Sequence, residues 1–82
     1  MVTADELYQK MALRQPLLPD DLRNPDIFVQ AARKLAEDRG VSLSAIDITI
    51  DDIQRLGETI PEEDVHAVFR AMAALATAAG EI

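Results

Sequence analysis

The chain contains no cysteine, which excludes disulfides, zinc–thiolate sites and thiol catalysis. It has a single histidine, and one imidazole without cysteine partners makes a poor transition-metal site. The three glycines stand far apart, so no glycine-rich loop is present to cradle phosphate groups. No serine lies in the pattern of a nucleophile with its base. We therefore expect a protein that is not an enzyme and that uses no cofactor or metal.

Long apolar runs are also missing. The longest, Ala71 to Ala79, is too short and too rich in alanine to cross a bilayer. The first residues lack the charged-then-apolar pattern of a secretory signal. The expected location is therefore the cytoplasm, away from any membrane.

Basic residues are scarce, with eight Lys and Arg against fifteen Asp and Glu, a formal net charge of −7. Affinity for nucleic-acid backbones and for anionic membranes comes from cationic side chains. The charge therefore disfavours both as partners. It is compatible with another protein, especially a basic one.

Aromatic residues are few as well, namely Tyr8, Phe28 and Phe69. The core must therefore be aliphatic, with Met11 and Met72 as adaptable fillers. A chain of 82 residues makes one domain, here residues 1–82, and buries only roughly 60–65% of its extended-chain surface. Because a second copy would supply the burial that the monomer lacks, a homodimer is expected.

Helix signals recur along the sequence and predict an all-α fold, a small four-helix bundle. Capping residues open a first helix from Thr3 to about Arg14 and a second from Asn24 to Gly40. The connector between them carries three leucines, at 17, 18 and 22, and a short helical piece is expected after Pro19. These leucines either cover the core or form an exposed docking patch.

Residues 46–50 alternate between isoleucine and polar residues, which is typical of a strand. No other segment offers a partner strand, so a strand here could pair only with a second copy of the chain. The competing interpretation, which we favour, is a short helix from Ser42 or Ser44 and then a third helix that begins at Thr49. Gly57 is expected to stop that third helix.

The fourth helix, Thr59 to Gly80, carries the strongest signals. Thr59 and Glu62 have the spacing of a capping box, and Pro61 falls in the first turn. The predicted core face consists of Val65, Val68, Phe69, Met72, Leu75, Ala76 and Ala79. A second stripe is all alanine, formed by Ala67, Ala71, Ala74 and Ala78. It is either an exposed face of good helix formers or a surface that a second helix approaches closely, inside the monomer or from a partner.

The centre of the chain has features of a helix-turn-helix, with Ala36 under a turn made by Gly40 and Ile46 anchoring the next helix. The stretch from Ala32 to Ser42 resembles the first helix and turn of phage-repressor-like regulators, which implies DNA binding. These 11 residues are about an eighth of the chain. Downstream, aspartates stand where a DNA-reading helix would carry Arg, Lys, Asn or Gln.

Taken together, the sequence predicts a small acidic, non-catalytic protein-interaction module that acts by helix-mediated protein binding. It would serve as a regulatory or accessory subunit, or as an inhibitor of the antitoxin kind. The predicted partner surface consists of Ala67, Ala71, Met72, Ala74, Leu75 and Ala78. The alternative is a helix-turn-helix DNA-binding regulator.

Overall fold

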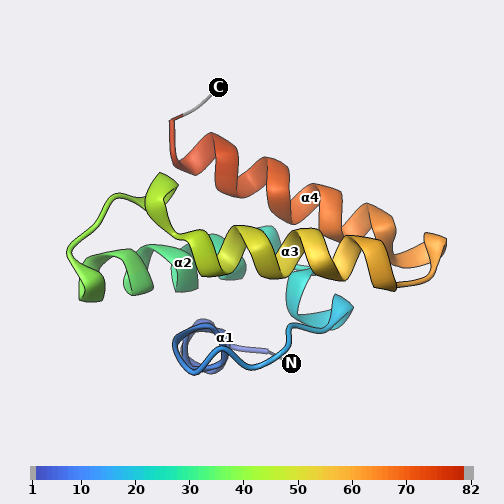
Figure 1. The fold of residues 1–82 in the computed structure, drawn as a ribbon, viewed down its shortest axis with the longest axis horizontal. Helices are drawn as coiled ribbons and strands as arrows, with labels where there is room; N and C mark the ends of the chain where they lie inside the picture. Colours follow the sequence, from blue (N-terminus) through green and yellow to red (C-terminus); the bar gives the residue numbers. More distant parts are fainter. Residues whose placement is uncertain (1, 81–82) are drawn as a thin grey trace.

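The computed structural model describes residues 2–80, and all the regular structure in them is helical. The four α-helices are α1 (Ala4–Ala12), α2 (Pro25–Arg39), α3 (Asp47–Thr59) and α4 (Glu62–Ala78), and two 3₁₀ segments are η1 (Pro19–Leu22) and η2 (Leu43–Ala45). Figure 1 shows their arrangement. The residues described contain no strand, so the predicted all-α bundle is confirmed and residues 46–50 are not extended.

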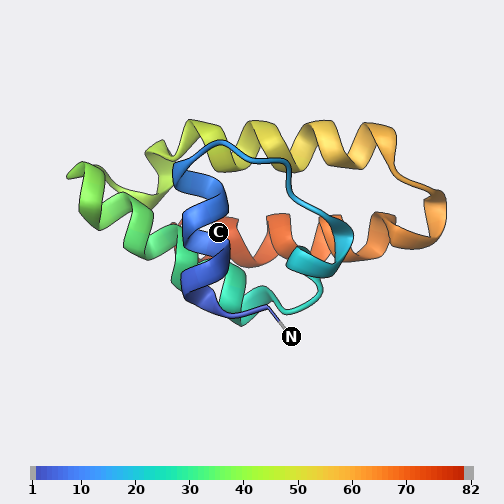
Figure 2. The same cartoon turned by 90° about the horizontal axis from the view of Figure 1, so that it is seen from below.

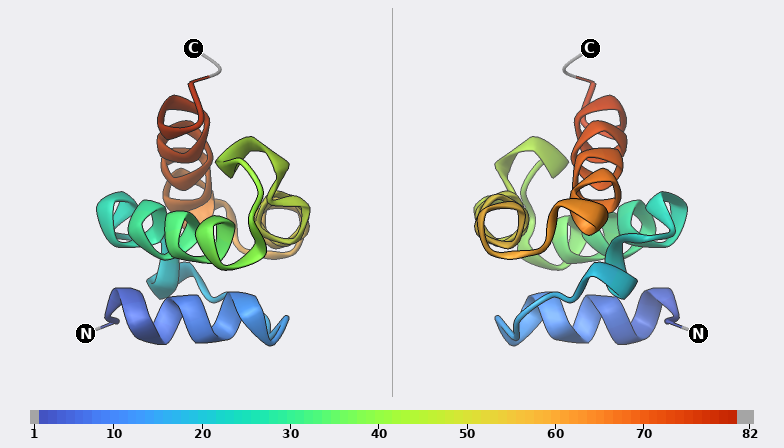
Figure 3. Two further views of the ribbon diagram at one scale, coloured as in Figure 1. Left: turned by 90° about the vertical axis from the view of Figure 1, so that its left-hand side faces the viewer. Right: turned by 90° about the vertical axis from the view of Figure 1, so that its right-hand side faces the viewer.

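Helix α2 lies at the centre of the bundle, between α1 on one side and α4 on the other (Figure 3). Its buried side chains are Phe28, Ala31, Ala32, Leu35 and Ala36. Phe28 is the one aromatic ring that the described residues place in the fully buried core. The remaining core is aliphatic, as the shortage of aromatic residues predicts, and Met11 is among its fully buried members.

Three of the first four predicted helix boundaries have the expected caps; the other, the end of the first helix, lies at Ala12 rather than near Arg14. The Thr3 hydroxyl accepts a hydrogen bond from the Glu6 amide at 3.2 Å, and the Asn24 side chain accepts from the first turn of α2. Gly40 ends α2 at a φ of 67°, and the amide of Val41 donates to the Ala36 carbonyl at 3.1 Å. This pattern is the Schellman stop that glycine favours.

The connector between α1 and α2 is an ordered turn, and the helical piece expected after Pro19 is present as η1. Asp21 holds it in place, because its buried carboxylate accepts hydrogen bonds from the Leu18 amide at 2.9 Å and from Lys10 Nζ at 2.8 Å. Of the three leucines, those at 17 and 22 are buried, whereas Leu18 is exposed. Through these two buried leucines the connector covers the core, as the first of the two interpretations proposed, rather than forming an exposed docking patch.

Helix α3 differs from its predicted bounds at both ends. It begins at Asp47 rather than Thr49, and Thr49 is fully buried instead of capping the helix. It continues through Gly57 to Thr59, so Gly57 is not a stop. The predicted capping box at the start of α4 is also wrong, because the Thr59 hydroxyl donates back to the carbonyl of Arg55 at 3.1 Å. Thr59 therefore finishes α3, and α4 begins after Pro61.

Helices α3 and α4 form an antiparallel hairpin, with a tight turn at residues 60–61 (Figures 1 and 2). Between α2 and α3 the chain makes a seven-residue link, from Gly40 to Ile46, that contains η2. A helix-turn-helix joins its two helices by three or four residues. Here Ala36 and Ile46 are buried on either side of the link, as that motif would require, but the longer link separates the two helices.

Candidate functional site

Helix α4 is turned about its axis relative to the core face predicted for it. Val68, Ala71 and Leu75 are the buried residues, whereas Phe69 is 62% exposed. The assignment of Phe69 to the core is therefore wrong. The physical reason is the close approach of α4 to α2, because small side chains such as that of Ala71 let two helices pack tightly.

The six residues of the predicted partner surface fall into two groups. Ala71 and Leu75 are buried in the chain's own core, and of the two only Leu75 lines a cavity that opens to the surface. The others, Ala67, Met72, Ala74 and Ala78, are half-buried. At Ala71 the alanine stripe therefore packs inside the monomer. The sequence had left open whether this stripe is an exposed face, a contact inside the monomer or a contact with a partner.

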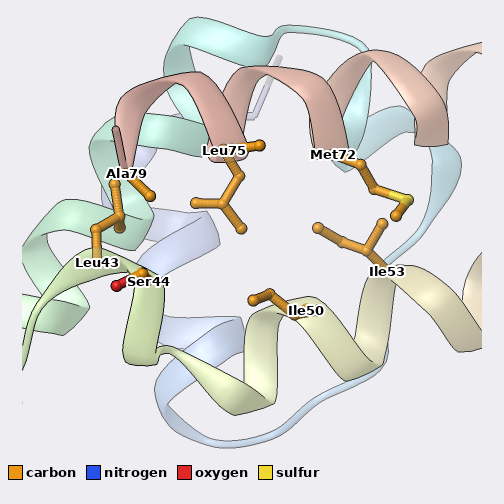
Figure 4. A pocket seen from close by; sticks show the side chains of 8 residues that line it. Leu43, Ser44, Ile50, Ile53, Met72, Leu75 and Ala79 are labelled. Atoms are coloured by element: carbon orange, nitrogen blue, oxygen red, sulfur yellow. The ribbon is translucent and has the colours of Figure 1, made fainter. Parts of the chain in front are cut away.

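A small apolar cavity lies between α4 and the segment formed by η2 and α3 (Figure 4). Its volume is about 150 Å³, and its lining residues are Leu43, Ser44, Ile50, Ile53, Met72, Leu75, Ala76 and Ala79. The Met72 and Ile53 side chains lie next to each other at one end of the cavity, on opposite helices (Figure 4). Ser44 is the one lining residue with a polar side chain, so the cavity suits an apolar group.

A second hollow, of about 270 Å³, continues along the hairpin toward its turn. It shares Ile53 and Met72 with the first, and its other lining residues are Gln54, Gly57, Glu58, Val65, Val68 and Phe69. We call the two together the α3–α4 groove. Two residues of the predicted partner surface, Met72 and Leu75, line this groove. Phe69 and the residues on α3 were not predicted for it, because their position depends on where α3 begins and how α4 is turned.

The negative charge of the chain is concentrated on this hairpin. Residues 47–80 hold seven acidic and two basic residues, which is a net charge of −5, whereas residues 1–46 hold seven acidic and six basic residues, a net charge of −1. In the structure, neither part of the groove is lined by a lysine or an arginine. The groove is therefore apolar at its base and set in an electronegative surface.

The rest of the molecule offers less for a site. A broader hollow between α2 and α4 contains Ala74 and Ala78 but is open and lined equally by polar and apolar atoms, with Arg33 at its edge. Within residues 2–80 no three carboxylate or imidazole side chains converge as metal ligands, and His66 is exposed. None of the helices in this part of the chain is long and apolar enough to cross a membrane.

The DNA-binding alternative depends on α3, which would be the reading helix. Its exposed residues include Asp47 and Asp51, and the one basic residue on α3, Arg55, forms an ion pair with Asp52. A helix with exposed carboxylates repels the phosphate backbone. The geometry therefore gives that alternative no support.

The remaining source of information is likeness to other proteins. Comparisons with known protein families, with curated proteins and with solved structures gave no match.

Proposed function

We propose that this chain is a non-catalytic protein-interaction module that binds another protein through the α3–α4 groove. One observation carries the proposal: an apolar groove is open at the surface of a hairpin whose net charge is −5. Exposed apolar surface of this kind is characteristic of protein contacts. Phe69 supports the same conclusion, because it is exposed beside the groove and aromatic residues are enriched at protein interfaces.

The proposal revises the surface that the sequence predicted. Met72 and Leu75 remain in it and Phe69 is added, whereas Ala71 is buried in the core and lines neither part of the groove. A regulatory subunit, an accessory of a larger complex and an antitoxin-like inhibitor would all use such a groove in the same way. The choice among them depends on the partner.

The expected homodimer stays a prediction, and the charge distribution argues against one form of it. Two copies that met groove to groove would bring together two hairpins of net charge −5. Like charges placed opposite each other at an interface disfavour association. A dimer, if formed, would therefore use another surface, such as the alanine-lined hollow between α2 and α4.

Site-specific photo-crosslinking in the native host tests the proposal. A photoreactive phenylalanine analogue replaces Phe69 in one variant and Leu13 in the other, because Leu13 is also exposed, at 69%, but lies at the end of α1. We expect discrete adducts from position 69 that are absent from position 13. An adduct of about twice the 9.0 kDa mass of the chain would identify a second copy. Equal labelling from both positions, or none from position 69, would refute the proposal.

A further inference from the structure

We infer that the occupant of the α3–α4 groove is a cationic amphipathic helix that inserts one large apolar side chain beside Met72. This inference rests on the proposed function and specifies its partner class. Three properties of the groove support it, namely the size of its cavity, its length and the placement of the charges along its edge.

The cavity has the size and lining of a pocket for a side chain. An apolar cavity of about 150 Å³ in another protein stays free of water and accepts a molecule as large as benzene. The cavity between Leu43, Ile50 and Leu75 has about that volume, 150 Å³. A leucine, methionine or phenylalanine side chain would therefore fit. Met72 lies at its end, and its flexible thioether can adapt to different shapes of the entering group.

The length of the groove suits a helix of about four turns. On α4 it is lined from Val65 to Ala79, which at about 1.5 Å per residue corresponds to roughly 21 Å. A partner helix of about 14 residues covers that distance. It would present apolar anchors at helical spacing to the groove, which is the usual way in which an amphipathic helix binds.

One carboxylate, that of Glu58, lines the groove, and helical spacing places two more beside it along α3. Gln54 and Glu58 line the groove from α3, and Asp47 and Asp51 precede them at intervals of three and four residues on the same stripe of the helix. Asp47, Asp51 and Glu58 are all exposed. A bound helix would therefore place its lysines or arginines on the side facing α3. Phe69, on the opposite helix, is 62% exposed beside the groove and is available to a further cation or apolar group.

This charge pattern also discriminates against other occupants. An acidic helix and a second copy of this hairpin would both be repelled by the same row of carboxylates. A neutral apolar segment would fit the cavity but leave the acidic edge without partners. The cationic amphipathic helix is the class that satisfies both the apolar base and the acidic edge.

A model peptide tests the inference directly. The probe is a fluorescein-labelled, 14-residue peptide of leucine and lysine in amphipathic helical order, and its control replaces every lysine by glutamate. Fluorescence anisotropy is expected to show saturable binding of the lysine peptide alone. Amide shifts in NMR spectra should change along α3 and α4 and not along α1. Raising the salt concentration should weaken binding by about tenfold, as three exposed ion pairs of ordinary strength would.

Matched variants separate specific binding from general attraction to an acidic protein. Phe69→Ser is expected to weaken peptide binding by about tenfold or more, whereas Leu13→Ser, equally exposed but on α1, should leave it unchanged. The pair Asp51→Asn with Glu58→Gln should lose most of the salt dependence. The control pair Glu6→Gln with Glu37→Gln changes the net charge by the same amount on α1 and α2 and should have little effect.

The outcomes distinguish this inference from the proposed function. Absence of binding by the lysine peptide, or equal binding to the Phe69→Ser and Leu13→Ser variants, would overturn the inference. If position 69 nevertheless crosslinks to a protein in the host, the proposed function stands and the occupant belongs to another class. If neither experiment gives position-specific contact, both fail.

Discussion

Replacing Gly57 by alanine is expected to stabilise the protein, because the structure places this glycine inside α3. Glycine in the middle of a helix costs about 0.5–1 kcal/mol relative to alanine. The added Cβ would lie 3.4 Å from Cγ1 of Val68, which is the near edge of ordinary van der Waals contact. The free energy of unfolding should therefore rise by about 0.5–1 kcal/mol, and the melting temperature by about 2–8 °C.

Gly40→Ala is the matched comparison and should act in the opposite direction. Gly40 ends α2 at a φ of 67°, and no atom lies within 4 Å of the position of a Cβ there. The change in stability of Gly40→Ala therefore measures the strain of the left-handed backbone alone, because the added methyl group meets no other atom. The left-handed conformation costs an alanine about 1–2 kcal/mol, so the melting temperature should fall by about 4–16 °C.

Thermal and urea unfolding of the two variants, followed by far-ultraviolet circular dichroism, measures both effects. The comparison decides between the structure and the sequence pattern, which predicted that Gly57 stops the third helix. If Gly57 were a left-handed helix stop, both substitutions would destabilise the protein. A loss of stability in Gly57→Ala as large as that in Gly40→Ala would therefore refute the continuous α3.

Two further substitutions test the packing of the connector and of α4. Asp21→Ala removes a buried carboxylate that accepts hydrogen bonds from a backbone amide and from Lys10. Urea titrations should show a free energy of unfolding lower by about 2–4 kcal/mol. The control is Asp20→Ala, which removes an exposed ion pair and should change the free energy of unfolding by less than about 0.5 kcal/mol. Ala71→Glu places a carboxylate in the core and should lower the free energy of unfolding by at least about 3 kcal/mol. Its control, Ala73→Glu, lies on the exposed side of the same helix and should leave the circular dichroism spectrum and the stability nearly unchanged.

The contradicting results are specific in each case. Equal effects at positions 20 and 21 would mean that the Asp21 carboxylate is solvated rather than buried. A folded Ala71→Glu variant of normal stability would mean that α4 does not pack on α2 as described. Because a domain of 82 residues has a total stability of about 4–12 kcal/mol, the Ala71→Glu loss should also broaden or abolish the unfolding transition.

Much of the fold follows from local signals in the sequence. Thr3, Asn24 and Gly40 act as caps in the positions where their chemistry predicts them, and Pro19 and Pro25 stand at the first positions of η1 and α2. These signals are reliable because each satisfies backbone groups within its own turn. Nothing distant in the chain has to be known for them to work.

The errors occur where a distant part of the chain decides the outcome. The alternation at residues 46–50 is typical of a strand, and the favoured helical interpretation is correct except for its start. Burial of Ile46, Ile48 and Thr49 against the core places the beginning of α3 at Asp47 rather than at Thr49. Likewise, apolar residues on several faces of α4 leave its rotation undetermined. Contact with α2 selects the face with Ala71, and Phe69 is consequently exposed. The candidate groove could not be predicted, because it depends on both outcomes.

The alanines that α2 and α4 bury have a consequence for the entropy of folding. A side chain without rotamers loses no rotational freedom when it is enclosed, whereas a buried methionine or leucine does. Burial of these alanines lets the two helix backbones approach closely and gains dispersion contacts, and it costs no side-chain entropy. They are Ala31, Ala32, Ala36 and Ala71. In a chain with a small core, this shifts the balance toward the ordered state.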